Sequence, residues 1–387
     1  MNTSVLKPEN FLLVSIIPHD VSDPEAFKDL KELKSLVEAQ GGKVADLVLQ
    51  RREVHDKGMY IGRGKIFEIA DLIKSEHIDV VVLNAAVKPG HIFEISNILS
   101  KTKRAIKVWD RVDLILEIFS KHANTAEAKL QIELAAMRHM GPRIYGMGHV
   151  LSRQGGGIGT LGVGETNTEL MKRHWQKEMK KTKDKLNKLS ADRERQLARR
   201  KKVGFQTVSI IGYTNVGKSS LFKKLTGKKT DIQNALFVTL DSSVGKIILP
   251  KSKSPILLSD TIGFIKNLPT DLIDAFKSTL MESIHADLLL HVIDITDDDM
   301  HRKISAVEEV LGSLNIRNKK RVYIFNKIDA VNNINKNLIS EEYNDFYPQF
   351  ISIKQNAGTE NLLKVIEECL EDSTPRLLKK RKLIHVD

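Results

Sequence analysis

The sequence predicts an α/β protein in which two sheet-containing domains are joined by a helical hairpin. Apolar, strand-like runs alternate with amphipathic helical patterns over residues 1–109 and again over residues 203–372, and this alternation is typical of parallel sheets covered by helices. Residues 110–202 instead carry helical patterns on both sides of a glycine-rich stretch, and residues 373–387 form a basic tail. We therefore expect an N-terminal α/β domain, a hairpin, a second α/β domain and a short tail.

Composition narrows the class of protein. A chain of 387 residues suggests two or three domains. Lys and Arg number 61 against 49 Asp and Glu, and the net charge of +12 favours a polyanionic partner, nucleic acid first and an anionic membrane surface second. The single cysteine, Cys369, excludes a disulfide framework and a structural zinc site built on several thiolates.

The sequence predicts no targeting or membrane-spanning segment. The first residues lack the charged, apolar and small-residue order of a signal peptide. No apolar run approaches the ~18 residues that a membrane span requires. We expect a cytoplasmic protein, and we expect it to be a monomer.

The first domain is expected to be a small parallel sheet with helices between its strands. Strand-like runs cover residues 11–17, 44–49 and 79–83. Helices are predicted over residues 23–40, over residues 66–74 and from Pro89 onward. The Gly62-Arg63-Gly64-Lys65 turn is a candidate site for an anion or a second nucleotide.

The hairpin is expected to have a glycine-rich tip. Helical patterns cover residues 112–119 and 126–140, and Gly141-Pro142 is predicted to end the second of them. Residues 152–169 contain six glycines and are predicted to be neither helix nor strand, because glycine loses much backbone entropy when it is ordered. The same stretch holds Arg153, Gln154 and Glu165, so direct function and a plain linker both stay open.

A long basic helix is predicted over residues 172–202. Its 14 basic and four acidic residues carry a net charge of +10, and its apolar residues form a narrow seam. One interpretation is that these basic residues form a solvated helix face, because runs of charged residues usually lie on such a face. The one-sided sign favours the other, contact with nucleic acid.

The second α/β domain carries a nucleotide-binding signature. Strand-like runs cover residues 207–211, 244–249, 256–258, 288–293, 322–325 and 350–353. Between the first of these and a helical pattern, one segment matches G-x-x-x-x-G-K-[ST]: Gly212-Tyr213-Thr214-Asn215-Val216-Gly217-Lys218-Ser219, followed by Ser220. Backbone N–H groups of such a loop wrap phosphates, Lys218 is expected on the β- and γ-phosphates, and the Ser219 hydroxyl is expected on Mg²⁺.

Two further motifs are typical of a GTPase. Asp260-Thr261-Ile262-Gly263 follows a strand 42 residues after Lys218, so that Asp260 is placed to hold Mg²⁺ and the Gly263 N–H to reach the γ-phosphate. Asn326-Lys327-Ile328-Asp329 follows a later strand. The Asp329 carboxylate can accept from both N1 and N2 of guanine, which selects GTP over ATP. We therefore expect a P-loop GTPase domain with a mixed, mostly parallel sheet and helices on both faces.

Two single residues bear on hydrolysis. Thr239 lies between the phosphate loop and Asp260, and we expect its hydroxyl on Mg²⁺ and its N–H near the γ-phosphate, with Thr230 as the competing choice. Phe264 stands where a glutamine commonly orients the attacking water. Because phenylalanine cannot hydrogen-bond water, intrinsic hydrolysis is expected to be slow.

These motifs resemble those of the HflX family of ribosome-associated GTPases over nearly the whole chain. Besides the GTPase motifs, the resemblance is carried by Tyr60-Ile61-Gly62-Arg63-Gly64-Lys65, Asp110-Arg111 and residues 129–135, 151–160 and 164–166. It implies GTP hydrolysis, binding to the large ribosomal subunit and splitting of stalled or idle ribosomes under stress. It also implies a further guanine motif at Ser352-Ile353-Lys354.

The resemblance implies ribosomal RNA contact by the hairpin tip, near the peptidyl-transfer region. The residues expected there are Arg153, Gln154, Gly155, Gly156, Gly157, Glu165, Lys172 and Arg173. A ribosome-assembly or RNA-remodelling factor controlled by GTP is the alternative function. A membrane-linked GTPase is a third, and the lack of an apolar anchor argues against it.

Overall fold

The computed structural model divides into two compact units, Met1–Asn187 and Lys188–Asp387. It describes residues 8–102, 106–154, 163–228, 243–261, 263–265, 272, 280–331 and 335–372; of residues 144–154 and 163–168 it describes the helical backbone only. Both units are α/β, as predicted. The predicted division at residues 109, 202 and 372 stays a prediction, since the boundary between the compact units falls inside a helix.

The first unit contains a four-stranded, fully parallel sheet in the order β2-β1-β3-β4. Its strands are β1 (Asn10–Ile17), β2 (Lys43–Arg51), β3 (Val80–Leu83) and β4 (Lys107–Asp110). Its helices are α1 (Asp23–Gln40), α2 (Arg63–Ser75), α3 (Pro89–Leu99) and α4 (Arg111–His122), with a short 3₁₀ turn at Ser100–Thr102.

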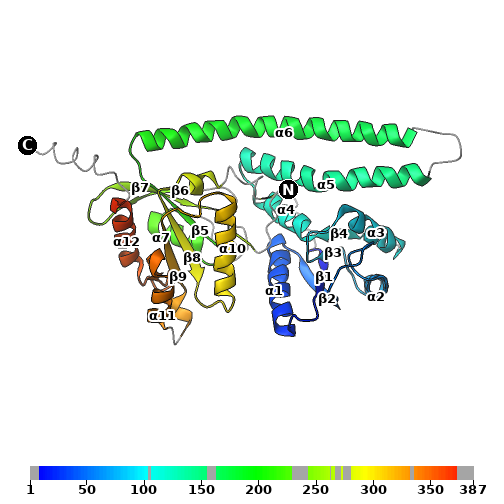
Figure 1. The fold of residues 1–387 in the computed structure, drawn as a ribbon, viewed down its shortest axis with the longest axis horizontal. Coiled ribbons are helices and arrows are strands. Elements are labelled where there is room, and N and C mark those ends of the chain that lie inside the picture. The colour runs from blue at the N-terminus through cyan, green and yellow to red at the C-terminus, as the bar shows by residue number, and fades with distance from the viewer. Residues whose placement is uncertain are drawn as a thin grey trace, which may run out of the picture. The chain divides into compact units, whose positions relative to one another are not determined.

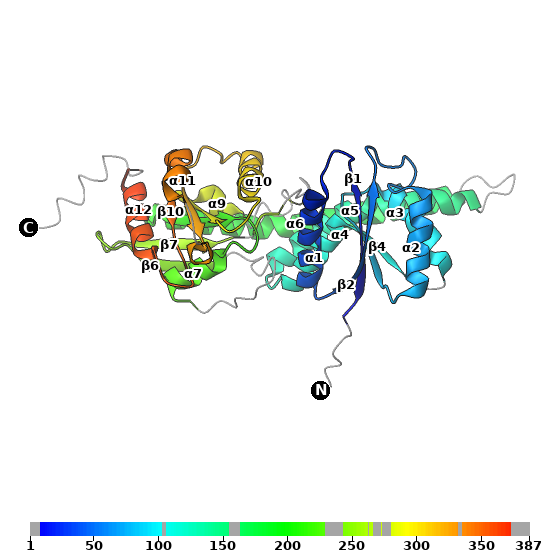
Figure 2. The ribbon, with the colours of Figure 1, turned by 90° about the horizontal axis from the view of Figure 1, so that it is seen from below.

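Helices cover both faces of this sheet, with α1 and α4 on one side and α2 and α3 on the other (Figure 2). Alternate residues of β1 explain the arrangement, because successive side chains of a strand point to opposite faces. Leu12 and Val14 join the cluster that includes Ile69 of α2 and Ile95 of α3. The apolar runs of the sequence therefore become a sheet that is buried on both sides.

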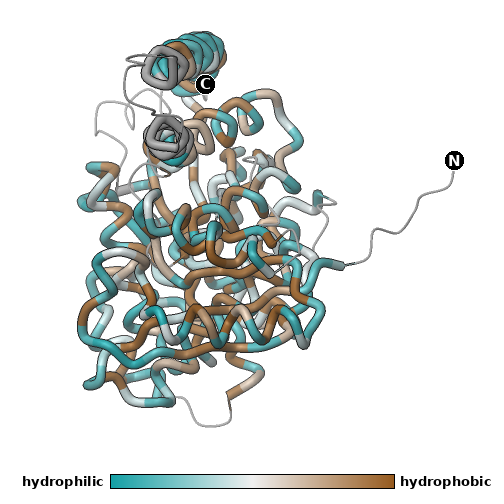
Figure 3. The backbone as a smooth tube through the Cα atoms, turned by 90° about the vertical axis from the view of Figure 1, so that its right-hand side faces the viewer, coloured by the Kyte–Doolittle hydropathy of each residue, from teal (hydrophilic) through white to brown (hydrophobic). Residues whose placement is uncertain are grey.

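Two long helices form the predicted hairpin, α5 (Ala126–Gln154) and α6 (Val163–Lys202). Within the first unit they run side by side (Figure 1), and the Trp175 indole N–H donates to the Met137 carbonyl at 2.9 Å while the Thr182 hydroxyl donates to Glu133. Hydrophilic residues predominate along α6, as Figure 3 shows. The apolar seam of α6 thus faces its neighbours, and its lysines stay in solvent.

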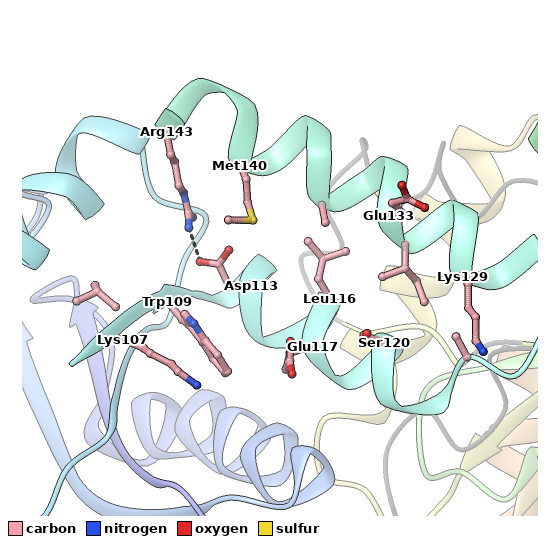
Figure 4. Close-up of a pocket in the computed structure, with 14 residues that line it drawn as sticks. Lys107, Trp109, Asp113, Leu116, Glu117, Ser120, Lys129, Glu133, Met140 and Arg143 are labelled. Atoms are coloured by element: carbon pink, nitrogen blue, oxygen red, sulfur yellow. Dashed lines mark hydrogen bonds and ion pairs between the residues drawn. The ribbon is translucent and has the colours of Figure 1, made fainter. Parts of the chain in front are cut away.

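Two expectations for the hairpin were wrong. Gly141-Pro142 does not end a helix, because α5 continues through Pro142 to Gln154. An internal proline costs about 3 kcal/mol. Here the next residue, Arg143, pairs with Asp110 at 3.0 Å and with Asp113 at 2.6 Å (Figure 4), which holds α5 against α4 at this point. Helix also reaches further into the glycine-rich stretch than predicted, since α5 extends to Gln154 and α6 begins at Val163; residues 155–162 lie outside the described residues.

The second unit contains a six-stranded sheet in the order β10-β9-β8-β5-β7-β6. Among the described strands of this sheet, β6 alone runs antiparallel to its neighbour. The strands are β5 (Thr207–Gly212), β6 (Ser243–Ile248), β7 (Pro255–Asp260), β8 (Leu288–Asp294), β9 (Arg321–Asn326) and β10 (Gln349–Phe350). The mixed, mostly parallel sheet that the sequence predicts is confirmed.

Helices lie on both faces of this second sheet. They are α7 (Lys218–Thr226), α9 (Met281–His285), α10 (Met300–Ser313), α11 (Lys336–Glu342) and α12 (Thr359–Asp372), with 3₁₀ turns at Ile328–Ala330 and Asn344–Phe346. Figure 1 shows α10 on one side of the sheet and α7 and α12 on the other. Because β5, β7, β8 and β9 run parallel, the loops at their carboxyl ends gather at one edge of the sheet, which is the usual ligand-binding edge of such a fold.

Candidate nucleotide-binding site

The loop between β5 and α7 has the backbone shape of a phosphate cradle. Gly212, Asn215 and Gly217 all have positive φ angles, of 144°, 63° and 101°. A β-carbon at Gly217 would lie 2.5 Å from Asn326 Nδ2, and one at Gly212 would lie 2.3 Å from the Val292 carbonyl oxygen. Both positions require glycine, because their φ angles are positive and a β-carbon would clash with a neighbouring atom. The loop continues into the N-terminus of α7, where backbone N–H groups bind anions.

Lys218, the first residue of α7, is buried beneath this loop. Its ammonium donates to the Tyr213 carbonyl at 2.6 Å, and a β-carbon at Gly263 would lie 2.8 Å from its Nζ. Burial lowers the pKa of Lys218 to about 8, while the negative charge of Asp260 acts in the opposite direction. The site therefore contains a cation that water does not solvate and that a bound anion would stabilise.

We predict that nucleotide binding takes up a proton through Lys218. Bound phosphates favour the ammonium form and raise its pKa, so the affinity falls as the pH rises through 8. Calorimetry of GDP binding in two buffers of different ionisation enthalpy is expected to show roughly 0.7 proton taken up at pH 8.5 and about 0.1 at pH 7. Lys218→Arg does not titrate in this range and is the control. Equal uptake at both pH values in the wild-type chain would contradict the prediction.

The end of β7 lies beside the phosphate loop. Asp260 is the last residue of β7, pairs with Ile210 of β5 and is fully buried. The Thr261 hydroxyl donates to the Ile210 carbonyl at 2.6 Å. Phe264 donates its N–H to the Gly212 carbonyl at 3.1 Å and accepts from the Thr214 N–H at 2.9 Å. Backbone hydrogen bonds thus bring the ends of the Asp260–Gly263 motif, predicted from its pattern, its place after a strand and its distance from Lys218, against the loop.

Phe264 turns away from the nucleotide edge into the core. Its side chain is 2% exposed and belongs to an apolar cluster with Ile211, Leu280 and Leu289. Nothing in this placement offers a hydrogen bond to water. Thr239, the predicted switch threonine, lies outside the described residues.

The guanine motif is tied to the phosphate loop from the end of β9. The Asn326 amide donates to the Val216 carbonyl at 2.9 Å and accepts from the Ile353 N–H at 3.4 Å. The Lys327 ammonium donates to the Asn215 carbonyl at 3.1 Å and to the Asp294 carboxylate at 2.5 Å. The adjacent side chains of Asn326 and Lys327 therefore connect the phosphate loop, the end of β8 and the segment after β10, which are distant in the sequence.

Asp329 accepts a hydrogen bond from Ser352, the first residue of the predicted Ser352-Ile353-Lys354 motif. The buried Ser352 hydroxyl donates to its Oδ1 at 2.6 Å. This hydrogen bond lowers the pKa of Asp329 below its ordinary value, and the charges of Lys354 and Lys327 act in the same direction. The carboxylate is consequently an anion at neutral pH, the form that accepts two hydrogen bonds from guanine.

Comparison with known proteins agrees with this geometry. Three family models match: GTP-binding GTPase N-terminal over residues 28–120, GTP-binding GTPase Middle Region over residues 122–200, and 50S ribosome-binding GTPase over residues 207–327. The chain is 41% identical to the GTPase HflX of Caldanaerobacter subterraneus subsp. tengcongensis over 95% of its own length and 82% of that protein. It is 34% identical to the Escherichia coli GTPase HflX, over 89% of this chain and 79% of that one.

The chain belongs to the HflX family of GTPases. The resemblance seen in the sequence motifs is confirmed. A solved structure described as the SsGBP and GDP complex matches 95% of this chain and 100% of that one, with a TM-score of 0.53 and 25% identity. A GTP-binding protein from Sulfolobus solfataricus in complex with GDP matches with a TM-score of 0.50 at 24% identity, which supports the fold.

The residues that this HflX chain was predicted to use for RNA are only partly described. Arg153 and Gln154 end α5 and Glu165 lies in the first turn of α6, while Gly155, Gly156 and Gly157 lie outside the described residues. Lys172 and Arg173 are exposed on α6. Within the described part of the chain, no helix is both long and apolar enough to cross a bilayer.

Sequence reasoning missed one residue of the site. Asp294 ends β8 and pairs with Lys327 of the guanine motif. An acid at the end of a buried, mostly apolar strand is a signal that could have found it, since the carboxyl ends of parallel strands share one edge.

A second polar cluster lies in the first unit. Asp110, Asp113 and His139 place ligand-type atoms within 4.8 Å of one another. The Arg143 guanidinium already pairs with both carboxylates, so a cation there would have to displace it. Beside the cluster is a groove of about 590 Å³ between α4 and α5, with Leu116 and Met140 among its lining residues (Figure 4). We interpret the cluster as the anchor of α5 on α4.

Proposed function

We propose that this HflX GTPase binds the large ribosomal subunit in its GTP state and acts in ribosome splitting or rescue under stress. One combination carries the proposal: a complete set of GTP-site motifs lies on the same chain as residues 172–202 of α6, a helical segment with a net charge of +10. The match of residues 207–327 to the family model of 50S ribosome-binding GTPases supports it. We place the protein in the cytoplasm as a monomer.

In the proposed mechanism, the phosphate loop binds GTP through its backbone. The N–H groups of the loop and of the first turn of α7 surround the phosphates, with the helix dipole adding to the attraction. The residues proposed for this are Gly212, Tyr213, Thr214, Asn215, Val216, Gly217, Lys218, Ser219 and Ser220. Lys218 neutralises charge on the β- and γ-phosphates, and the Gly263 N–H contacts the γ-phosphate. The β-carbon-free backbone of Gly263 lets Lys218 lie this close.

We propose that the base is selected by residues from β9 and from the segment after β10. Asp329 accepts from guanine N1 and N2, and the Ile353 N–H donates to O6. Asn326 and Ser352 position these two groups, Lys327 covers the base, and Lys354 adds positive charge beside Asp329.

The residues present fit a magnesium ion. Ser219, Asp260 and Thr239 offer hydroxyl and carboxylate oxygens, the donors that Mg²⁺ prefers. The carboxylate of Asp260 is fully buried within the electrostatic reach of Lys218, at the edge where phosphates are expected. When bound, Mg²⁺ neutralises charge on the β- and γ-phosphate oxygens.

Hydrolysis requires a water molecule to attack the γ-phosphorus. Phe264 cannot orient that water, because its side chain is apolar and lies in the core. We propose that the free protein hydrolyses GTP slowly and that the ribosome completes the site. The hairpin tip and the exposed residues Lys172 and Arg173 of α6 would contact ribosomal RNA through phosphates and base edges.

The alternative function is a ribosome-assembly or RNA-remodelling factor controlled by GTP. The long basic face of α6 favours it, since lysines that bind phosphates do not require a mature subunit. The two functions differ in their target, because only the first acts on intact ribosomes.

We predict that purified large subunits stimulate GTP turnover. The expected increase in kcat is at least about tenfold, because an added group orients the water or stabilises transition-state charge. Turnover is measured with and without subunits, and sucrose gradients report dissociation of intact ribosomes. Lys218→Ala is the blank. Binding without stimulation would place the trigger elsewhere, action confined to immature particles would favour the alternative, and absence of binding would refute the ribosomal assignment.

A further inference from the structure

A buried carboxylate in the second unit joins the GTPase core to the last part of α6. Glu282 lies in α9 and is 6% exposed. Arg200 of α6 donates through Nη1 to Oε1 of Glu282 at 3.2 Å and to Oε2 of Glu282 at 3.4 Å. Arg193, seven residues earlier on the same helix, places Nη2 3.8 Å from Oε1. We refer to these three residues as the Glu282 clamp.

Burial of the Glu282 carboxylate costs free energy that only its partners offset. A buried carboxylate is stable only when its charge is paired and its lone pairs are hydrogen-bonded. Residues seven apart lie on one face of a helix, about two turns from each other, so Arg193 and Arg200 can reach the same carboxylate. Movement of α9 relative to α6 would leave this charge without compensation, and the two helices are therefore expected to move together.

The short helix α9 is also connected to the phosphate loop. Leu280 and Ile284 pack in the apolar cluster that contains Phe264, and Phe264 exchanges backbone hydrogen bonds with Gly212 and Thr214. The Ser283 hydroxyl lies 2.9 Å from the hydroxyl of Ser209 in β5, the strand that leads into the loop. Each step is a packed or hydrogen-bonded contact within the second unit.

We propose that Glu282 is a positioning residue that transmits the nucleotide state to α6. A change at Gly263 on contact with the γ-phosphate reaches Phe264, the next residue, and through its cluster reaches α9 and the clamp. Within the second unit, this coupling acts on residues 188–202, the part of α6 that carries both arginines. The inference goes beyond the proposed ribosomal function and needs no RNA partner for its test.

The test is hydrogen–deuterium exchange on the full chain, with GDP and with a non-hydrolysable GTP analogue. In the wild-type chain, exchange of residues 188–202 is expected to differ at least about threefold between the two states. In Glu282→Gln the difference is expected to vanish while both nucleotides still bind. Arg195→Ala is the matched control, since Arg195 is exposed on α6 and pairs with Asp192 of the same helix; it is expected to retain the difference.

Two results would overturn the inference: equal exchange of α6 in both states of the wild-type chain, or an unchanged difference in Glu282→Gln. If Glu282→Gln does not fold, the double variant Glu282→Gln/Arg200→Gln removes both charges of the closer pair and leaves groups that can hydrogen-bond. It is expected to lose the difference as well. Subunit binding by the wild-type chain is measured separately, so that failure of the ribosomal assignment is distinguishable from failure of the clamp.

Discussion

Lys218→Ala is expected to lower kcat/KM for GTP by about 10³-fold, because it removes a preorganised positive charge from the transferring phosphoryl group. Lys218 is buried, donates to the Tyr213 carbonyl and lies against Gly263. No solvent has to be displaced when charge develops on the γ-phosphate, which makes the interaction stronger than one at the surface.

The same substitution is not expected to unfold the protein. In the nucleotide-free chain, burial already disfavours the Lys218 ammonium and lowers its pKa, so alanine relieves a desolvation cost while losing one hydrogen bond. Thermal unfolding without nucleotide is expected to stay within a few degrees of wild type, whereas stabilisation by added GDP is expected to be lost. Lys223→Ala, on the exposed side of α7, is the matched control and should hydrolyse GTP normally. Wild-type turnover in Lys218→Ala would refute the proposed site.

Local patterns predicted most of the fold, because most strands and helices are specified by their own residues. The alternation of apolar runs with capped helices gave both sheets, and the glycines of the phosphate loop are dictated by positive φ angles within the loop itself. The proline at residue 142 misled the prediction because its local preference is overridden by Arg143, whose partners Asp110 and Asp113 lie about 30 residues away. Strand β4 was missed for a similar reason, since its four residues are fixed by pairing with β3.

The site was predictable as motifs but not as an assembly. Spacing located Lys218, Asp260 and Asp329, since each belongs to a short pattern with its own chemistry. The contacts that join those patterns connect residues far apart in the sequence: Asn326 with Val216, Lys327 with Asp294, and Ser352 with Asp329. Tertiary packing alone brings such pairs together, and the Glu282 clamp belongs to the same class.

Asp329→Asn is expected to exchange guanine specificity for xanthine specificity. The carboxylate of Asp329 is oriented by the Ser352 hydroxyl at 2.6 Å and stays ionised, since that hydrogen bond lowers its pKa. Guanine presents two donors, N1–H and N2–H, to this anion. An amide offers one acceptor and places an N–H₂ group against the guanine amino group, so one charge-assisted hydrogen bond is lost and two donors meet. Affinity for GDP is expected to fall by about 10²–10³-fold.

Xanthine carries a carbonyl in place of the guanine 2-amino group, which matches the amide of the variant and opposes the carboxylate of the wild-type chain. The variant is therefore expected to bind xanthosine diphosphate at least about 10²-fold more tightly than the wild-type chain does. Fluorescence titration with labelled guanosine and xanthosine diphosphates measures both changes. Asp298→Asn removes an exposed carboxylate from the same unit and is the matched control. Loss of affinity for both nucleotides in Asp329→Asn would mean that this side chain supports the loop and does not read the base.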